Sequence, residues 1–156
     1  MIAGRTRAAA PERPLTMTPP DTPTDAVLAQ LVDAARAARA HAYAPYSRFQ
    51  VGAAVLDDAG RIHAGCNVEN AAYPQGTCAE AGALAAMVLA GGRRVRAVAV
   101  VGEGAEPVTP CGGCRQKLRE FAAPDVTVVI ADSQRERARH TMDQLLPASF
   151  GPENLK

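Results

Sequence analysis

Two short cysteine-containing segments constrain the fold of this chain more than any other feature. They are Cys78-Ala79-Glu80 and Pro110-Cys111-Gly112-Gly113-Cys114, and each opens a stretch with the apolar spacing of a helix. Unpaired backbone N–H groups and the dipole at a helix start stabilise thiolates, the form of cysteine that binds metal ions. Cys111 and Cys114 are close enough in sequence for both sulfur atoms to point the same way and hold one ion. The pattern therefore predicts a fold in which two helix starts share a metal site.

The number of cysteine ligands favours a catalytic zinc site. Three sulfur ligands leave a fourth tetrahedral position for water, whereas a structural zinc site is closed by a fourth protein ligand. Zinc lowers the pKa of such a water from about 15.7 toward about 7. Glu80 follows Cys78 by two positions, so it can lie beside this water without binding the metal. Glu80 is therefore the candidate catalytic residue.

The residues alone leave other interpretations of the cysteines open. A Cys-x-x-Cys pair can be a redox pair or half of a structural zinc site, and Cys66 is the one further cysteine in the sequence. Alternation along the expected strand turns Cys66 toward the core and turns Asn67 and Glu69 together toward the other face, so we expect Cys66 to be a packed thiol. The three histidines are isolated and are expected to be surface or packing residues: His41, His63 and His140.

The rest of the pattern predicts one α/β domain behind a tail. Residues 1–24 hold several prolines among small and polar residues, which predicts a disordered N-terminal tail, with the catalytic domain over 25–156. Apolar spacing predicts helices that begin near Asp25, Cys78 and Cys111, a short helix near Met142, and strands over 49–55, 62–68, 95–101 and 126–130. This order implies an α/β/α sandwich around a mixed sheet.

Charge and composition exclude several classes of partner. The formal net charge is +1, aromatic residues make up 4% of the chain, and tryptophan is absent. Polynucleotide-binding proteins usually show a basic excess and aromatic stacking platforms, so we expect a small neutral substrate and no nucleic acid. No stretch approaches the roughly 20 apolar residues that span a bilayer, and no signal-peptide core is visible. We therefore expect no membrane partner and a cytoplasmic location.

With these motifs in view, the chain resembles the zinc-dependent cytidine deaminases, and among them the small-subunit tetrameric type with three cysteine ligands. The likeness runs from about Ala44 to Leu155. It rests on the two zinc segments and on the runs Tyr-Ser-Arg-Phe-Gln-Val-Gly-Ala-Ala (46–54), Asn-Val-Glu-Asn-Ala-Ala-Tyr (67–73) and Leu-Leu-Pro-Ala-Ser-Phe (145–150). The zinc segments alone would indicate only the wider deaminase superfamily. The last two runs narrow the resemblance to enzymes that act on free nucleosides.

The resemblance implies both the fold and the reaction. It implies a mixed five-stranded sheet, one Zn²⁺ per chain on Cys78, Cys111 and Cys114, and hydrolytic deamination of cytidine and deoxycytidine with release of ammonia, in pyrimidine salvage. Glu80 would take a proton from water, give one to N3 of the base, and pass one to the departing amine. A single carboxylate suffices because it alternates between base and acid.

The same resemblance assigns the substrate-binding residues. Phe49 would pack against the nucleoside, Asn67 and Glu69 would bind the ribose 3′-hydroxyl, and Ala79 would contact the base through its backbone. Phe150 would reach into a neighbouring subunit's site, which implies a homotetramer whose sites are completed by neighbours. Without the resemblance, Asn67 would be a capping residue, Glu69 a solvated carboxylate and Phe150 a residue of the chain's own core.

One departure from the family concerns the charge of the site. Many relatives with three cysteine ligands have arginine directly after the catalytic glutamate, where this chain has Ala81. Three thiolates on Zn²⁺ carry a net charge of −1, which weakens the metal's effect on water. We expect the two helix starts and Arg115, next to Cys114, to offset that charge.

Two competing functions follow from the same residues. The first is another aminohydrolase on the same fold, such as a blasticidin-type antibiotic deaminase or a free-base deaminase, which would share the zinc segments. The second is a non-catalytic structural zinc-binding protein, which would have a closed coordination sphere and would unfold without metal.

Overall fold

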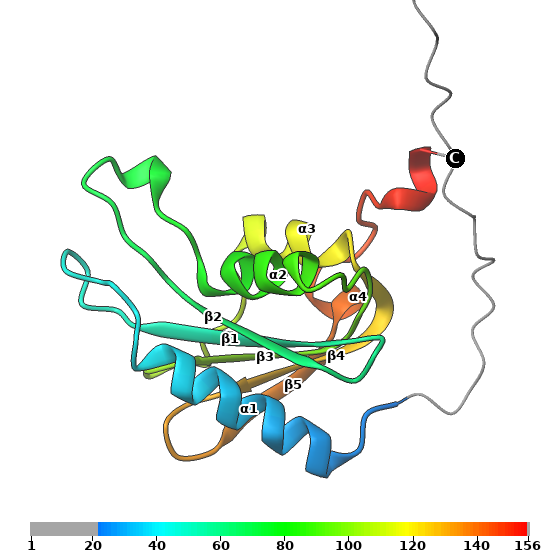
Figure 1. The fold of residues 1–156 in the computed structure, drawn as a ribbon, viewed down its shortest axis with the longest axis horizontal. Helices are drawn as coiled ribbons and strands as arrows, with labels where there is room; N and C mark the ends of the chain where they lie inside the picture. The colour runs from blue at the N-terminus through cyan, green and yellow to red at the C-terminus, as the bar shows by residue number, and fades with distance from the viewer. Residues whose placement is uncertain (1–21, 156) are drawn as a thin grey trace, which may run out of the picture.

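The computed structural model describes residues 22–155, and every structural statement below concerns this part of the chain. Of the predicted tail, residues 1–21 lie outside it. A mixed sheet carries the strands in the order β2-β1-β3-β4-β5, with α1 on one face and α2 and α3 on the other (Figure 1). The predicted α/β/α sandwich around a five-stranded mixed sheet is thereby confirmed. The elements are α1 (Asp25–Arg39), β1 (Val51–Asp57), β2 (Ile62–Cys66), α2 (Ala79–Leu89), β3 (Val95–Gly102), α3 (Gly112–Arg119), β4 (Ala122–Ala131), β5 (Glu136–Thr141) and α4 (Met142–Leu145), with 3₁₀ turns at Tyr73–Gln75 and Pro152–Leu155.

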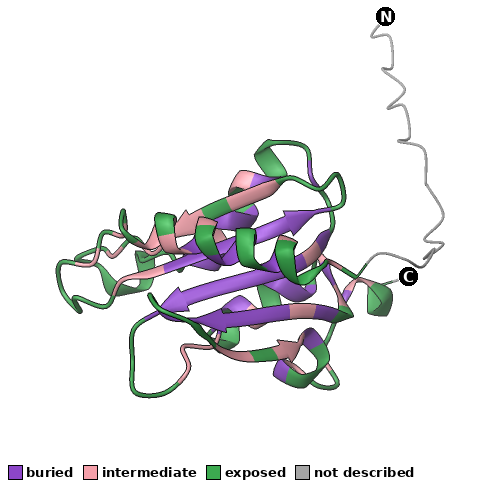
Figure 2. Ribbon diagram, turned by 90° about the horizontal axis from the view of Figure 1, so that it is seen from below, coloured by how far each residue is buried: buried purple, intermediate pink, exposed green. Residues whose placement is uncertain are grey.

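The valine-rich segment after α2 forms the central strand of the sheet. β3 pairs antiparallel with β1 and parallel with β4, and α3 lies between the two parallel strands in the sequence. Both faces of the central strands are buried, as the purple ribbons in Figure 2 show. Alternate residues of β1 therefore serve two cores: Ala53 and Val55 pack toward α2 and α3, whereas Ala54 and Leu56 pack toward α1.

The strand β2 is shorter than the alternation predicts. It ends at Cys66, and Asn67 begins an irregular segment whose backbone pairing is reduced to isolated bridges from Val68 to Tyr43 and Thr77. The reason lies in Asn67, whose side chain bonds the backbone at two neighbouring positions and takes the place of a continuing ladder. Cys66 is a free, partly buried thiol.

A buried carboxylate links the β1–β2 hairpin to the far end of α2. Asp57 is fully buried and accepts hydrogen bonds from Arg61 Nε at 2.8 Å and from the backbone N–H of Ala59 and Arg61. Burial raises the pKa of Asp57, but hydrogen bonds from His63 and Arg61 outweigh that effect and bring the pKa to about 2. Arg61 also donates to the carbonyl of Ala90, which closes the hairpin onto the end of α2.

None of the helices within residues 22–155 has the length and apolar character needed to cross a bilayer.

Candidate metal centre and active site

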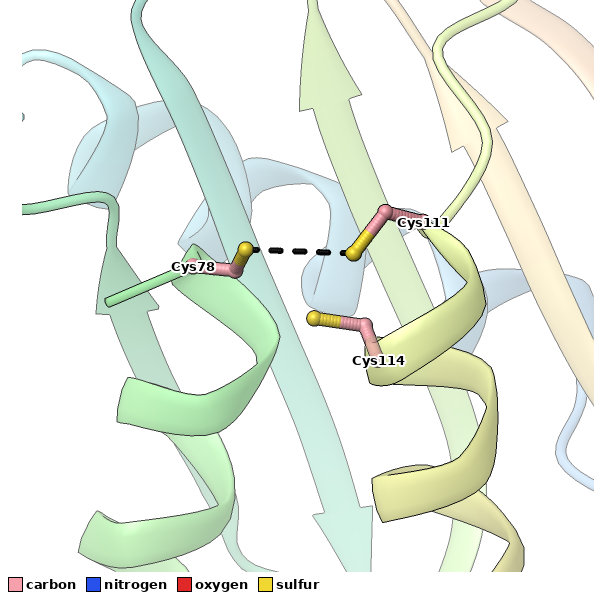
Figure 3. A group of neighbouring side chains, drawn as sticks. All are labelled: Cys78, Cys111 and Cys114. Atoms are coloured by element: carbon pink, nitrogen blue, oxygen red, sulfur yellow. Dashed lines mark hydrogen bonds between the residues drawn. The ribbon is translucent and has the colours of Figure 1, made fainter. Parts of the chain in front are cut away.

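The starts of α2 and α3 lie side by side and bring three cysteines together. Cys78 is the N-cap residue of α2, Cys111 is the N-cap residue of α3, and Cys114 lies in the first turn of α3. Figure 3 shows the three side chains pointing toward one another from the two helix starts. The two cysteine segments therefore meet in the structure, as the shared metal site predicted from the sequence requires.

The spacing of the sulfur atoms fits one tetrahedral zinc ion. The three Sγ atoms all lie within 4.8 Å of one another, and Cys78 Sγ lies 3.9 Å from Cys111 Sγ. Zn–S bonds of about 2.3 Å in a tetrahedron place two sulfur atoms roughly 3.8 Å apart. A disulfide needs about 2.05 Å, and all three cysteines are free thiols. The cluster therefore has the form of a metal site rather than of a redox pair.

The electrostatics of the cluster favour a bound cation. The backbone N–H of Cys114 lowers the pKa of Cys111, as expected for a thiolate at a helix start. Burial raises the pKa of Cys78 and of Cys114, and the negative charge of Glu80 adds to both increases. Four acidic groups in one place cannot all be ionised unless a positive charge balances them. The donor set of three sulfurs is one that zinc prefers.

Glu80 lies beside the cluster in the first turn of α2. Its side chain is buried, with 4% of the residue exposed, and its negative charge is, after burial, the main cause that raises the pKa of Cys114. Ala79 is completely buried on the same turn. A carboxylate held next to three metal-binding sulfurs, without itself belonging to the cluster, can exchange protons with a fourth ligand of the metal.

Arg115 connects the loop before Cys111 to the C-terminal part of the chain. Its guanidinium donates to Pro110 O at 2.7 Å, to Leu145 O at 2.8 Å and to Thr109 Oγ1 at 3.0 Å. These hydrogen bonds go to oxygen atoms rather than to the ligand sulfurs. Arg115 therefore joins the loop before Cys111 to the residues at the end of α4.

The predicted ribose-binding residues lie together and organise a loop. Asn67 accepts a hydrogen bond from Val51 N at 2.8 Å and donates to Phe49 O at 2.9 Å. Glu69 accepts from Tyr46 N at 2.8 Å and from the Ser47 hydroxyl, and the Ser47 bond is the main reason that the pKa of Glu69 is lowered. The structure thus places Phe49, Asn67 and Glu69 in one unit.

Ser47 and Arg48 are parts of this unit that the sequence reasoning missed. Ser47 Oγ also accepts from Phe49 N at 3.0 Å, and Arg48 adopts a positive φ of 59°. Ser47 is the local signal that could have indicated a tight turn, because serine hydroxyls often bond the backbone two residues further on.

Phe150 lies on the C-terminal arm, residues 146–155, and does not fill the core of its own chain. Its exposed fraction is 59%, and its carbonyl accepts from Gln116 Nε2 at 3.0 Å. The arm is held by the C-terminal half of α3, whereas the metal cluster lies at the start of that helix.

The fold and the cluster define the class of the protein, which is a zinc-dependent enzyme built on an α/β/α sandwich with a buried glutamate beside the metal site. The chain belongs to the family described as "Cytidine and deoxycytidylate deaminase zinc-binding region", whose sequence profile matches residues 26–130. Zinc is the cofactor of this family, and the three clustered cysteines can hold it.

Individual relatives agree with this assignment. The chain is 41% identical to the cytidine deaminase of Sporosarcina psychrophila over 126 residues, which cover 81% of this chain and 93% of that protein. It is 43% identical to the cytidine deaminase of Halalkalibacterium halodurans over 125 residues, which cover 80% and 95%.

Solved structures show the same likeness in three dimensions. The crystal structure of cytidine deaminase from Burkholderia pseudomallei matches with a TM-score of 0.74 at 45% identity, over 78% of this chain and 98% of that one. The enzyme from Mycobacterium tuberculosis matches with a TM-score of 0.67 at 42% identity, over 80% and 97%. The chain is therefore similar to cytidine deaminases over nearly all of their length.

Proposed function

We propose that this protein deaminates cytidine and deoxycytidine by hydrolysis, in pyrimidine salvage in the cytoplasm. The observation that carries the proposal is the pairing of the three-sulfur cluster with the buried carboxylate of Glu80, which lies in the first turn of the helix that Cys78 begins. A purely structural zinc site has no use for a buried carboxylate beside an incomplete ligand set, because burying a charge is costly. The similarity to named cytidine deaminases supports the choice of substrate.

The residues divide the chemistry among them. Cys78, Cys111 and Cys114 would hold zinc, which when bound supplies a Lewis acid that makes water a nucleophile near neutral pH. Glu80 accepts a proton from the attacking water and donates one to N3 of the cytosine ring, which makes C4 electrophilic. The C4–O bond forms first. Glu80 then takes the remaining O–H proton of the added water and delivers it to the amine, so that the C4–N bond breaks, ammonia leaves, C4 becomes a carbonyl and N3 keeps its proton. The products are uridine or deoxyuridine.

Substrate positioning is assigned to the segments around the cluster. Ala79 would present its backbone to the base, and Phe49 would pack against the nucleoside. Asn67 and Glu69 would meet the ribose 3′-hydroxyl, with Glu69 held ionised by its lowered pKa and oriented by the Ser47 hydroxyl. An oriented carboxylate and amide loses less entropy when it binds a sugar hydroxyl than a mobile one would.

We infer that the active form is a homotetramer in which Phe150 completes a neighbour's site. Phe150 is exposed on its own chain, and several aromatic side chains are exposed on the loops around residues 43–73. Tyr46 and Tyr73 form an edge-to-face pair there, with ring centroids 6.0 Å apart. Clustered exposed aromatic side chains are typical of protein interfaces.

The decisive test of the function is a comparison of substrates with the purified, zinc-loaded protein. Loss of absorbance near the cytidine band is followed with cytidine, deoxycytidine, free cytosine and blasticidin S. We expect turnover of the two nucleosides and little of the others. Turnover of cytosine or blasticidin S alone would overturn the nucleoside assignment while keeping the zinc site, and no turnover of any of the four would favour a structural zinc protein.

Replacing Arg115 is expected to weaken the metal site. Arg115→Ala removes the hydrogen bonds that fix the loop before Cys111 and one nearby positive charge, so we expect zinc release to a chromogenic chelator about tenfold faster than in the wild type. The acidic limb of the pH–rate profile should also move to higher pH, because a less positive site acidifies water less. Lys117→Ala removes an exposed charge from the same helix and is the matched control. Unchanged release and an unchanged acidic limb in Arg115→Ala would refute this role.

A further inference from the structure

The C-terminal arm is attached to α3 by side chains of that helix. Arg119 donates from Nε to Ser149 Oγ at 3.0 Å and forms an ion pair through Nη2 with Glu153. Gln116, three residues earlier on the same helix, donates to the carbonyl of Phe150. Arg119 thus contacts the side chains of residues on both sides of Phe150, and Gln116 contacts the backbone of Phe150 itself.

The Arg119 guanidinium is buried while its acidic partner is not. The side chain of Arg119 is 9% exposed, and that of Glu153 is 57% exposed. Arg119 therefore forms part of the body of the protein, and the arm closes over it. A buried guanidinium needs partners for its donors. The core supplies the carbonyl of Ala122 to Nη1 at 3.5 Å, and the arm supplies the partners of Nε and Nη2.

Gly151 lets the arm backbone approach the guanidinium closely. A Cβ added to Gly151 would lie 2.6 Å from Arg119 Nη2 and 2.7 Å from Cζ, a separation that a side chain does not allow. Gly151 itself is buried, and its N–H donates to Asn154 Oδ1 at 2.7 Å within the following 3₁₀ turn. The neighbouring Phe150 remains 59% exposed. The backbone is fixed on either side of a residue that is largely exposed on its own chain.

We propose that Arg119 is a positioning residue that fixes the C-terminal arm so that Phe150 is presented to the substrate, an assignment that rests on the proposed deaminase function. Gln116 assists it from the same helix. The brace, defined as Gln116 and Arg119, belongs to the helix that carries Cys111 and Cys114. The arm therefore takes its position from the element that holds two of the three sulfur atoms of the metal site. The free enzyme then presents the aromatic ring ready for substrate, without first having to order the arm.

The test is a double-mutant cycle read by steady-state kinetics on cytidine. If Arg119 acts through Phe150, Arg119→Ala should raise KM about tenfold and change kcat less than about threefold in the wild-type background. The same change in a Phe150→Ala background should have little further effect. An equal rise in KM in both backgrounds would refute the proposal, because Arg119 would then act independently of Phe150. Arg119→Lys keeps the charge but cannot contact Ser149 and Glu153 together, so its KM should lie between those of the wild type and Arg119→Ala.

Two further variants separate positioning from folding. Ser149→Ala with Glu153→Ala removes the two arm side chains that Arg119 contacts and leaves Arg119 itself in place, so it should reproduce the rise in KM even if Arg119→Ala folds poorly. Lys117→Ala, an exposed charge on the same helix, is the matched control and should leave KM unchanged. A normal KM in the double arm variant would overturn the proposal.

A spectroscopic measurement tests the brace without reference to activity. The chain has no tryptophan, so Phe150→Trp introduces a single reporter on the arm. Its fluorescence anisotropy in the zinc-loaded protein should fall when Arg119→Ala is added and should be unaffected by Lys117→Ala. Unchanged anisotropy in the Arg119→Ala background would refute the brace. If the wild type turned over no pyrimidine nucleoside, the proposed function would fail, and the anisotropy would still decide whether Arg119 holds the arm.

Discussion

Glu80→Gln is expected to reduce kcat on cytidine on the order of 10⁴-fold while the protein keeps its fold and its zinc. Glutamine has nearly the same shape as glutamate, so the buried site beside the cluster can accept it without repacking. The amide cannot accept a proton from water or carry one to N3 and to the leaving amine. All the proton transfers assigned to Glu80 are therefore lost together.

The metal should remain bound in this variant for an electrostatic reason. The negative charge of Glu80 raises the pKa of both Cys78 and Cys114. Removing that charge makes the two thiolates easier to form, so Glu80→Gln should bind zinc at least as well as the wild type. Retained zinc with lost turnover is a combination that a structural zinc site does not predict.

The measurement combines turnover with metal content. Cytidine consumption is followed by absorbance, zinc per chain is determined by mass spectrometry under native conditions, and Glu120→Gln, an exposed glutamate just after α3, is the matched control. Turnover within about tenfold of wild type would show that Glu80 is not the proton carrier. Loss of zinc together with turnover would indicate a structural or ligand role instead.

The metal site could be predicted because its signals are local in sequence. Cys78 and Cys111 each stand at a helix start, and the positions of those starts follow from apolar spacing over a few turns. Only the contact between the Cys78 and Cys111 segments joins residues that are distant in sequence. That contact could be predicted because one ion bound by all three sulfur atoms requires it. The central strand was predictable for a similar reason, because an uninterrupted valine-rich run has few alternatives to a buried strand.

The strand β5 could not be found in the same way. Glu136–Thr141 contains arginine, glutamate and histidine where an apolar alternation would be expected, and it lies at the edge of the sheet beside β4 alone. Charged side chains on an edge strand protect it from pairing with other chains. The charged side chains that suit this strand to the edge of the sheet also remove the apolar alternation by which a strand is recognised in a sequence. Only the family resemblance, which implies five strands, indicated that it exists.

The loop around Phe49 could not be predicted from the sequence for a different reason. The sequence placed Asn67 and Glu69 on one face of a strand that was expected to continue to residue 68. In the structure the two side chains still act together, but they do so by bonding the backbone of residues 46–51 from an irregular segment. Side chains that replace backbone hydrogen bonds leave no periodic signal, because their partners are distant in sequence.

Gly65→Ala is expected to destabilise the protein by at least about 3 kcal/mol and to disrupt the metal site. Gly65 lies on β2 directly beneath the first turns of α2. A Cβ at this position would lie 2.6 Å from Ala79 O and 2.7 Å from the carbonyl carbon of Gly82, and would also meet Ala83 N. All three are backbone atoms, so no side-chain rotation relieves the overlap. The helix would have to move away from the sheet.

That movement would carry Cys78 and Glu80 with it. Cys78 caps α2 and Glu80 lies in its first turn, whereas Cys111 and Cys114 belong to α3 and would stay in place. A displacement of α2 therefore separates one sulfur from the other two, and metal affinity depends on all three. The free energy of unfolding from chemical denaturation and the zinc content per chain should both fall in Gly65→Ala.

Gly82→Ala provides the control from the opposite side of the same interface. A Cβ on Gly82 would come no closer than 3.5 Å to Gly65 Cα, an ordinary contact, and alanine favours a helix over glycine by about 0.8–1 kcal/mol. We therefore expect Gly82→Ala to be as stable as the wild type or more so, with its zinc retained. If Gly65→Ala unfolded at the same denaturant concentration as the wild type and bound the same amount of zinc, the close approach of α2 to β2 would not be what places Glu80 beside the cysteines.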